Sequence, residues 1–233
     1  MFDSVENVRQ QLQSAGYLCN VDIATAVFLA ARLQKPLLVE GPAGVGKTEL
    51  GRAVSRATSR ELVRMQCYEG LDESKSLYEW AYAKQLLYAE LLKEKLKELL
   101  RDAPSFRESV ERLGREDDAF FSDRFLLPRP LLRAIRSPQP VVLLVDEVDK
   151  SDAEFESFLL EVLSDFTVTI PELGTLLPTT IPFVVLTSNN AREMSDPLRR
   201  RCLHLFIDYP DAARELDIVR LHVPGVAEKL ASA

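Results

Sequence analysis

The apolar residues of this chain form short continuous runs that alternate with segments of helical periodicity. Continuous apolar, β-branched runs are typical of strands that a parallel sheet buries on both faces. We expect such strands at 36–40, 61–66, 141–145 and 182–187. Residues 3–15 read as a short polar helix, and 21–33 as an amphipathic one. Further helices are expected at 49–57 and 152–163. The alternation predicts an α/β fold with three layers and a parallel central sheet.

The segment after the second strand has a different pattern. Residues 71–103 contain no Gly or Pro, and leucines between 87 and 100 recur at helical spacing. Opposite charges three residues apart, such as Glu90 and Lys93, favour a solvated helix face. We expect one long inserted helix whose leucine stripe packs on the domain rather than forming a free partner site. A further helix at 105–114 and an acidic turn at 116–118 are expected to follow it.

Residues 167–178 place β-forming residues on either side of a turn that contains Pro and Gly. This pattern predicts a β-hairpin within about 167–181. The segment 120–130 is apolar, basic and proline-bearing, and it comes shortly before the strand at 141–145. It is expected to be an inserted segment that a buried anchor holds in place.

The composition limits the class of protein. A chain of 233 residues is long enough for one α/β domain with a small appendage. A net charge of −7 argues against broad binding to nucleic acid. The N-terminus does not resemble a signal peptide and no apolar run reaches membrane-spanning length, so we expect a cytoplasmic protein without a membrane partner. Cys19, Cys67 and Cys202 are scattered, which favours reduced thiols.

Residues 41–48 fit the phosphate-binding pattern G-x-x-x-x-G-K-[ST], between a predicted strand and a predicted helix. The glycines leave the backbone N–H groups open to phosphate oxygens, and the helix start adds its positive dipole end. Lys47 should reach the β- and γ-phosphates, and the Thr48 hydroxyl should bind Mg²⁺. A glycine turn with a surface lysine is the alternative, which the flanking strand and helix disfavour. The candidate nucleotide-binding residues here are Gly41, Pro42, Ala43, Gly44, Val45, Gly46, Lys47, Thr48 and Glu49.

Two further strands end in polar residues. The run 141–145 leads into Asp146 and Glu147, where Asp146 can hold the hydration shell of Mg²⁺ and Glu147 can polarise an attacking water. Taken alone, the pair equally fits a solvated acidic turn. The run 182–187 leads to Asn189, whose amide can contact both the water and the γ-phosphate, although an asparagine-rich turn would have the same sequence.

Three consecutive arginines, residues 199–201, follow a helix start signal at Asp196 and Pro197. They fit a solvated helix face. They equally fit an arginine finger that completes the nucleotide site of a neighbouring subunit.

In this order, the motifs resemble those of the AAA+ ATPases over about residues 17–210. The resemblance implies a P-loop core that binds ATP and Mg²⁺, hydrolyses ATP and assembles into a homo-oligomeric ring, with a hexamer expected. It places Asn189 at the sensor-1 position and Arg201 at the finger, with Arg200 as the next choice. Tyr17 lies where many AAA+ proteins bind adenine; it could stack there, but ordinary packing is favoured.

The resemblance also implies a division of the chain. We expect a nucleotide-binding core at 1–209, with an insertion at about 71–130, and the start of an incomplete helical lid at 210–233. No position matches the family's sensor-2 arginine.

Within the AAA+ proteins, the hairpin before Asn189 is similar to that of the MoxR group. Residues 67–80 resemble a subset related to CoxD, which is associated with maturation of metal-containing carbon monoxide dehydrogenase. These likenesses imply a chaperone for a protein client, and a von Willebrand factor A-type partner. By analogy with ring ATPases, loop residues could face the pore and contact a client, although burial of these loops as anchors is favoured. The candidates are Tyr68, Glu69, Phe121 and Arg124.

The favoured function is therefore a Mg²⁺-dependent ATPase that remodels or matures a protein client. A nucleotide-binding switch or scaffold with little hydrolysis is the first alternative, and a nucleic-acid motor is the second. A small-molecule kinase is least favoured, because the Asp146–Glu147 pair with Asn189 suits attack by water.

Overall fold

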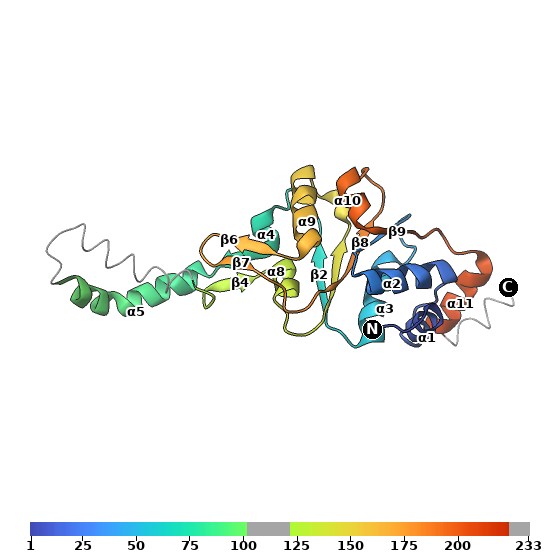
Figure 1. Cartoon of the computed structure of the whole chain (residues 1–233), viewed down its shortest axis with the longest axis horizontal. Coiled ribbons are helices and arrows are strands. Elements are labelled where there is room, and N and C mark those ends of the chain that lie inside the picture. The colour runs from blue at the N-terminus through green and yellow to red at the C-terminus, as the bar shows by residue number, and fades with distance from the viewer. Residues whose placement is uncertain (102–121, 224–233) are drawn as a thin grey trace.

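The computed structural model describes residues 1–101 and 122–223 of the chain (Figure 1). Five parallel strands form the central sheet, which confirms the predicted fold class. The expected helix at 105–114, the turn at 116–118 and Phe121 lie outside the described residues. In spatial order the strands are β2 (Leu62–Gln66), β5 (Val142–Asp146), β8 (Phe183–Ser188), β1 (Leu37–Glu40) and β9 (Leu203–Phe206).

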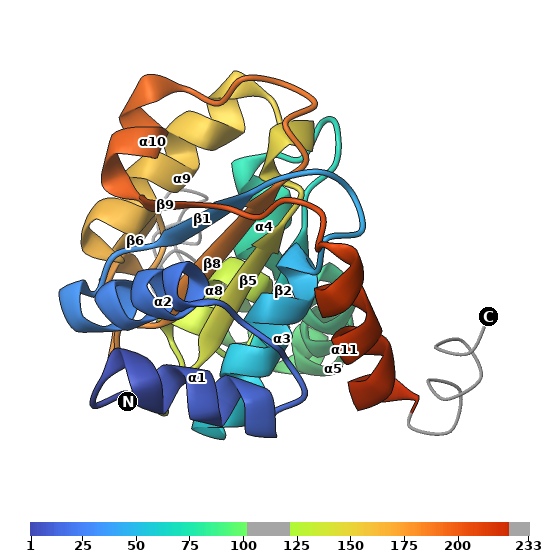
Figure 2. The same ribbon diagram turned by 90° about the vertical axis from the view of Figure 1, so that its right-hand side faces the viewer.

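Helices cover both faces of this sheet, and Figure 2 shows the strands between the two sets. One core contains side chains of α1 (Val5–Ser14), α2 (Val21–Leu33) and α3 (Lys47–Thr58). The other contains side chains of α4 (Glu73–Leu77), α8 (Pro130–Ile135), α9 (Ala153–Asp165) and α10 (Asp196–Arg201). Alternate residues of a strand point to opposite faces, so Val142 and Leu144 join the first core and Leu143 and Val145 join the second.

Several helices begin with a side-chain cap, whereas α8, α10 and the helix that follows the glycine-rich loop do not. The Asn20 side chain accepts from the backbone N–H of Ile23 at 2.9 Å, and Asp152 accepts from that of Phe155 at 2.9 Å. Helix α3 instead begins after Gly46, which has a φ of 92° and no side chain to cap the helix. The first N–H groups of α3 are therefore left for a ligand.

The segment after β2 is not the single long helix expected at 71–103. It forms α4, then β3 (Tyr78–Trp80), and then α5 (Tyr82–Arg101). Strand β3 pairs with β4 (Leu126–Pro128) in an antiparallel two-stranded sheet. The prediction of one helix is wrong because Tyr78 and Trp80, both aromatic residues that favour strands, find partners in β4 and in each other, with ring centroids 5.7 Å apart.

Helix α5 projects away from the central sheet (Figure 1). Its Leu87 and Leu91 are 58% and 71% exposed. The expectation that the leucine stripe packs on the domain is therefore wrong for these two residues, because Tyr88 rather than either leucine is the side chain of α5 that packs against the core. The predicted charge pair is present, since Lys93 Nζ lies 3.1 Å from Glu90 Oε1.

The remaining segments complete the fold. Strands β6 (Val168–Ile170) and β7 (Gly174–Leu176) form the predicted antiparallel hairpin. Phe125 is buried beside β4, as expected for an anchored segment, whereas Arg124 and Tyr68 are exposed. After β9 the chain enters α11 (Ala212–His222), none of whose residues is buried. Within the described residues, no helix has the length and apolar character needed to cross a membrane.

Candidate functional site

The phosphate-binding loop between β1 and α3 depends on glycines with positive φ. Gly41, Gly44 and Gly46 have φ values of 150°, 86° and 92°. A Cβ atom at Gly41 would lie 2.0 Å from the backbone oxygen of Ile207, so glycine there also permits close approach to the end of β9.

Lys47 closes this loop from inside. Its Nζ donates to the carbonyl oxygens of Gly41 and Pro42, at 2.7 and 2.5 Å. Burial lowers the pKa of Lys47, and the nearby acidic residues, led by Asp149, partly oppose the shift. Within the part of the chain that the structure describes, Lys47 Nζ has no carboxylate hydrogen-bond partner, and it lies at the start of α3.

The loop and the strand ends enclose a hollow of about 410 Å³. The structure brings together here most of the candidate residues from the loop with Asp146, Glu147 and Asn189. Thr187 and Arg52 also line the hollow, although no sequence motif indicated them. The full lining is Ala43, Gly44, Gly46, Lys47, Thr48, Glu49, Arg52, Asp146, Glu147, Thr187 and Asn189.

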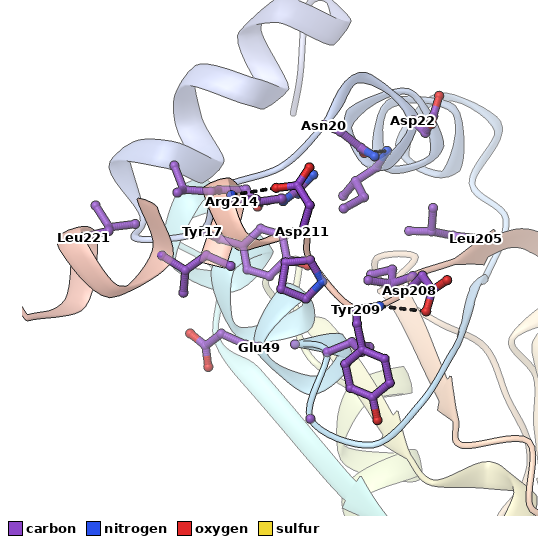
Figure 3. Close-up of a pocket in the computed structure, with 18 of the residues that line it drawn as sticks. Tyr17, Asn20, Asp22, Glu49, Leu205, Asp208, Tyr209, Asp211, Arg214 and Leu221 are labelled. Carbon is purple, nitrogen blue, oxygen red and sulfur yellow. Dashed lines mark hydrogen bonds between the residues drawn. The ribbon is translucent and has the colours of Figure 1, made fainter. Parts of the chain in front are cut away.

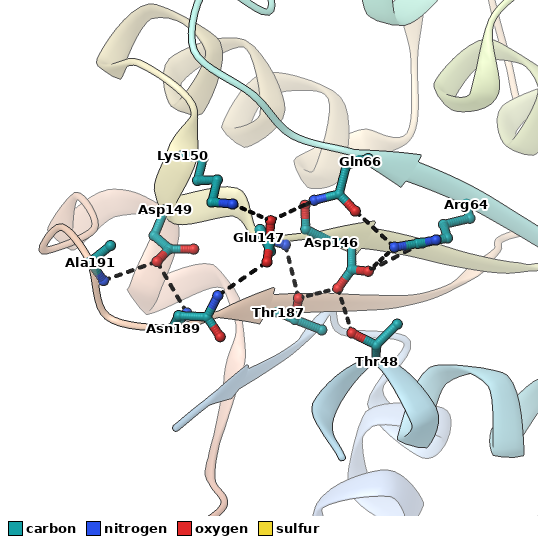
Figure 4. A network of polar contacts seen from close by, with 10 residues as sticks. All are labelled: Thr48, Arg64, Gln66, Asp146, Glu147, Asp149, Lys150, Thr187, Asn189 and Ala191. Atoms are coloured by element: carbon teal, nitrogen blue, oxygen red, sulfur yellow. Dashed lines mark hydrogen bonds and ion pairs between the residues drawn. The ribbon is translucent and has the colours of Figure 1, made fainter. Parts of the chain in front are cut away.

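Asp146 is the most tightly bound side chain of the site (Figure 4). Its Oδ1 accepts from the hydroxyls of Thr48 at 2.8 Å and Thr187 at 2.6 Å. Its Oδ2 accepts from Nε and Nη2 of Arg64 at 3.1 and 2.6 Å. Burial by itself raises the pKa of Asp146, but these hydrogen bonds outweigh burial and bring the pKa below its ordinary value.

Glu147 is held by donors from three different segments (Figure 4). Gln66 Nε2 and Lys150 Nζ lie 2.8 and 2.7 Å from its Oε2, and Asn189 Nδ2 donates to Oε1 at 3.3 Å. Its backbone N–H donates to the Thr187 hydroxyl at 2.9 Å. Glu147 has a φ of 56°, a conformation that costs a non-glycine residue about 1–3 kcal/mol. The Glu147 residue in this conformation lines the hollow.

Two buried carboxylates fix the loop between Asn189 and α10. Asp149 lies in the 3₁₀ helix η1 (Val148–Lys150), and its Oδ2 accepts from the backbone N–H of Asn189 at 3.1 Å. Glu156 on α9 pairs with Arg192 and accepts from the backbone N–H of Ser195 at 2.9 Å. The segment after Glu147 thus positions both the backbone of Asn189 and the start of α10.

The arginines proposed as fingers lie at the end of α10. Arg200 and Arg201 are exposed, and among the described residues neither forms an ion pair. Neither lines the phosphate hollow of its own chain. The structure therefore does not bring them together with Lys47 and Glu147 in one molecule.

A second, larger hollow of about 570 Å³ adjoins the first and shares Gly44, Gly46 and Glu49 with it (Figure 3). Its apolar wall includes Tyr17 and Ile23, together with residues of β9 and α11. Val45 also lines this hollow rather than the phosphate hollow.

Tyr17 and Arg214 define the inner part of this second hollow. The Tyr17 ring is buried and packs against Gly46, where an added Cβ would lie 3.6 Å from the ring. Burial raises the pKa of Tyr17, so the phenol stays neutral. Arg214 on α11 donates to the backbone oxygen of Leu18 at 3.2 Å and so ties α11 to this wall. Tyr17 therefore packs in the core and also lines the second hollow.

The oxygen donors of the site suit Mg²⁺. The Thr48 hydroxyl and the Asp146 carboxylate meet at 2.8 Å, and both are hard oxygen ligands. No cluster of three or more His, Cys, Asp or Glu able to hold a metal occurs at 1–101 or 122–223. Mg²⁺ typically uses one or two protein oxygens together with substrate phosphates and water, so the donor set fits it.

Comparison with known proteins agrees with this geometry. Residues 36–202 match the family model described as an AAA domain of the dynein-related subfamily. The crystal structure of a presumed ATPase from Cytophaga hutchinsonii matches with a TM-score of 0.51 at 20% identity, over 93% of this chain and 56% of that one. The chain thus spans little more than half of that protein, and the likeness shows the fold alone. No curated protein matches the chain.

Proposed function

Because the chain belongs to the dynein-related subfamily of AAA domains, we propose that it is a Mg²⁺-dependent ATPase. The observation that carries this is the pair of adjoining hollows at the start of α3. One is apolar and lined by Tyr17, as a base requires, and the other is lined by backbone amides, Lys47 and Thr48, as a triphosphate requires. Their shared glycines would lie at the junction of the nucleoside and the phosphates.

The loop and α3 supply the binding. Backbone N–H groups around Gly44 and Gly46 and the uncapped start of α3 attract the phosphate oxygens. Lys47 leaves the two carbonyls it now contacts and donates to the β- and γ-phosphates. Thr48 and Asp146 would hold Mg²⁺, which neutralises charge on the phosphates when bound.

Glu147 and Asn189 supply the hydrolysis. Glu147 accepts a proton from a water whose oxygen attacks the γ-phosphorus, while the bond from that phosphorus to the bridging oxygen breaks and ADP leaves. Asn189 orients the water and the γ-phosphate. Glu147 must first give up a donor at Oε2, because Gln66 and Lys150 both occupy that oxygen.

The exposed arginines support assembly. Arg201, with Arg200 as the next choice, would donate to the γ-phosphate in a neighbouring copy, because neither lines its own hollow. We propose a homo-oligomeric ring, with a hexamer expected. In the proposed division, residues 1–209 form the core and 210–233 begin a lid, while the MoxR- and CoxD-like features suggest a protein client and a von Willebrand factor A-type partner.

The test pairs binding with turnover over a range of protein concentrations. Glu147→Gln should bind ATP and release no phosphate. Specific activity of the unsubstituted chain should rise with protein concentration, and Arg201→Ala should abolish that rise while Arg9→Ala, a change to an exposed arginine on α1, should not. A chain that binds no ATP would overturn the whole proposal, and normal turnover in Glu147→Gln would overturn the role of the base.

One observation favours a second candidate, a nucleotide-binding switch that hydrolyses ATP poorly. Both carboxylate oxygens of Glu147 accept hydrogen bonds in this structure, so the base is not free. Tight ATP binding without phosphate release at any protein concentration would favour the switch.

A further inference from the structure

Arg64 lies in β2, which forms one edge of the central sheet, and makes the charged contact to Asp146. Its guanidinium donates through Nε and Nη2 to Oδ2 of Asp146, while Thr48 and Thr187 donate to Oδ1. We propose that Arg64 is a positioning residue that competes with the divalent cation for Asp146 and must withdraw as the cation binds. This inference rests on the proposed ATPase site.

Asp146 needs a positively charged side chain beside it because its carboxylate is buried. The Asp146 side chain is 3% exposed, and a buried carboxylate needs an opposite charge and hydrogen-bond donors. Among the described residues near it, Lys47 donates to backbone carbonyls and Lys150 pairs with Glu147, so Arg64 supplies the charge.

A divalent cation at Thr48 and Asp146 changes this balance. The cation and a guanidinium held 2.6 Å from the same carboxylate repel each other through a poorly solvated medium. Arg64 therefore raises the cation concentration that the site needs. Its two hydrogen bonds also orient the Asp146 carboxylate before the cation arrives.

Arg64 is able to withdraw. Its side chain is 43% exposed, and β2 has no further strand beside it in the central sheet, so the guanidinium can move into solvent. A buried arginine would leave unpaired donors behind, whereas a half-exposed one exchanges its contacts for water.

Withdrawal has a second consequence for the base. Arg64 Nη2 also donates to Oε1 of Gln66 at 2.8 Å, and Gln66 Nε2 donates to Glu147 at 2.8 Å (Figure 4). Loss of Arg64 from this chain of contacts frees Gln66 to rotate away from Glu147. Cation binding at Asp146 therefore loosens one of the donors that restrain Glu147.

The test measures cation binding without turnover. A non-hydrolysable fluorescent ATP analogue is titrated with Mg²⁺ in the unsubstituted protein and in Arg64→Met, which keeps side-chain length but removes the charge. Mn²⁺ binding is followed in parallel by electron paramagnetic resonance. We expect Arg64→Met to lower the half-saturating Mg²⁺ concentration about three- to tenfold, as removal of a partly exposed charge contact allows. Arg133→Met, which removes a charge paired with Glu61 away from the hollow, should leave that concentration unchanged.

The outcomes separate this inference from the proposed function. An unchanged or higher Mg²⁺ requirement in Arg64→Met, with analogue binding intact, overturns the role of Arg64 and leaves the ATPase proposal standing. No analogue binding by the unsubstituted protein overturns the ATPase proposal itself. Should Arg64→Met fail to fold, Arg64→Gln provides the same neutral comparison with the same expected direction, and Arg64→Lys, which keeps the charge, should stay within about twofold of the unsubstituted protein.

Discussion

Gly41 offers a direct test of the geometry that joins the phosphate-binding loop to the end of β9. The substitution Gly41→Ala adds one methyl group whose carbon would lie 2.0 Å from the backbone oxygen of Ile207. That oxygen cannot rotate aside as a side chain can, and the backbone N–H of Ile207 is tied to the carbonyl oxygen of Glu40 at 2.8 Å. Relief of the overlap requires the loop and β9 to move apart.

The cost is estimated from two contributions. A positive φ costs a non-glycine residue about 1–3 kcal/mol, and Gly41 has a φ of 150°. Overpacking adds about 1–3 kcal/mol, and contact with fixed backbone places Gly41→Ala near the upper value. Gly44→Ala is the matched control, since Gly44 has a φ of 86° but no atom within 4 Å of an added Cβ. The two substitutions should therefore differ by about 3 kcal/mol in free energy of unfolding.

Thermal unfolding, monitored by circular dichroism without nucleotide, measures this difference. For a chain of this size 1 kcal/mol changes the melting temperature by about 2–4 °C, so Gly41→Ala should melt about 6–12 °C below Gly44→Ala. Equal melting temperatures would refute the close approach of Gly41 to Ile207. Denaturant unfolding of the same proteins gives an independent value.

Three other substitutions test the polar network and the second hollow. Thr187→Val should lower the free energy of unfolding by about 1–3 kcal/mol, because Asp146 loses a donor, whereas Thr187→Ser should restore it in denaturant unfolding; equal losses would contradict this. Glu156→Gln should remove the carboxylate partner of Arg192 and reduce the rise of ATPase activity with protein concentration; an unaltered rise would show that α10 does not depend on the charge of Glu156. Tyr17→Ala should weaken ATP binding about tenfold by calorimetry while Tyr17→Phe should not, since stacking requires only the ring; equal affinity in Tyr17→Ala would place the base elsewhere.

The parts of the fold that sequence could predict are those with local signals. The runs that became β1, β5 and β8 are continuously apolar because the sheet buries them on both faces. Strand β9 was missed because it lies at the sheet edge, where its four residues alternate in burial and give no apolar run. Strands β3 and β4 were missed because each has three residues and gains stability only from pairing with a partner far away in the chain.

The same distinction applies to the site. The motif residues of the loop and the Asp146–Glu147 pair could be predicted because each set forms a short, contiguous sequence motif. Arg64 and Gln66 carry no such motif, since they read as the polar face of a half-exposed strand. Their role follows from the register that places Gln66 beside Asp146 across β2 and β5, and strand register is a property of the whole sheet.

The start of α3 has no side-chain cap of its own, and this feature links nucleotide binding to the stability of the folded chain. The first N–H groups of such a helix lack hydrogen-bond acceptors, and the oxygens of a bound triphosphate would supply them. A ligand present at a hundred times its dissociation constant adds about 2.7 kcal/mol to the stability of the state that binds it. Bound nucleotide would then stabilise the fold in addition to its proposed role in hydrolysis, and the nucleotide-free protein would be the more sensitive to protease.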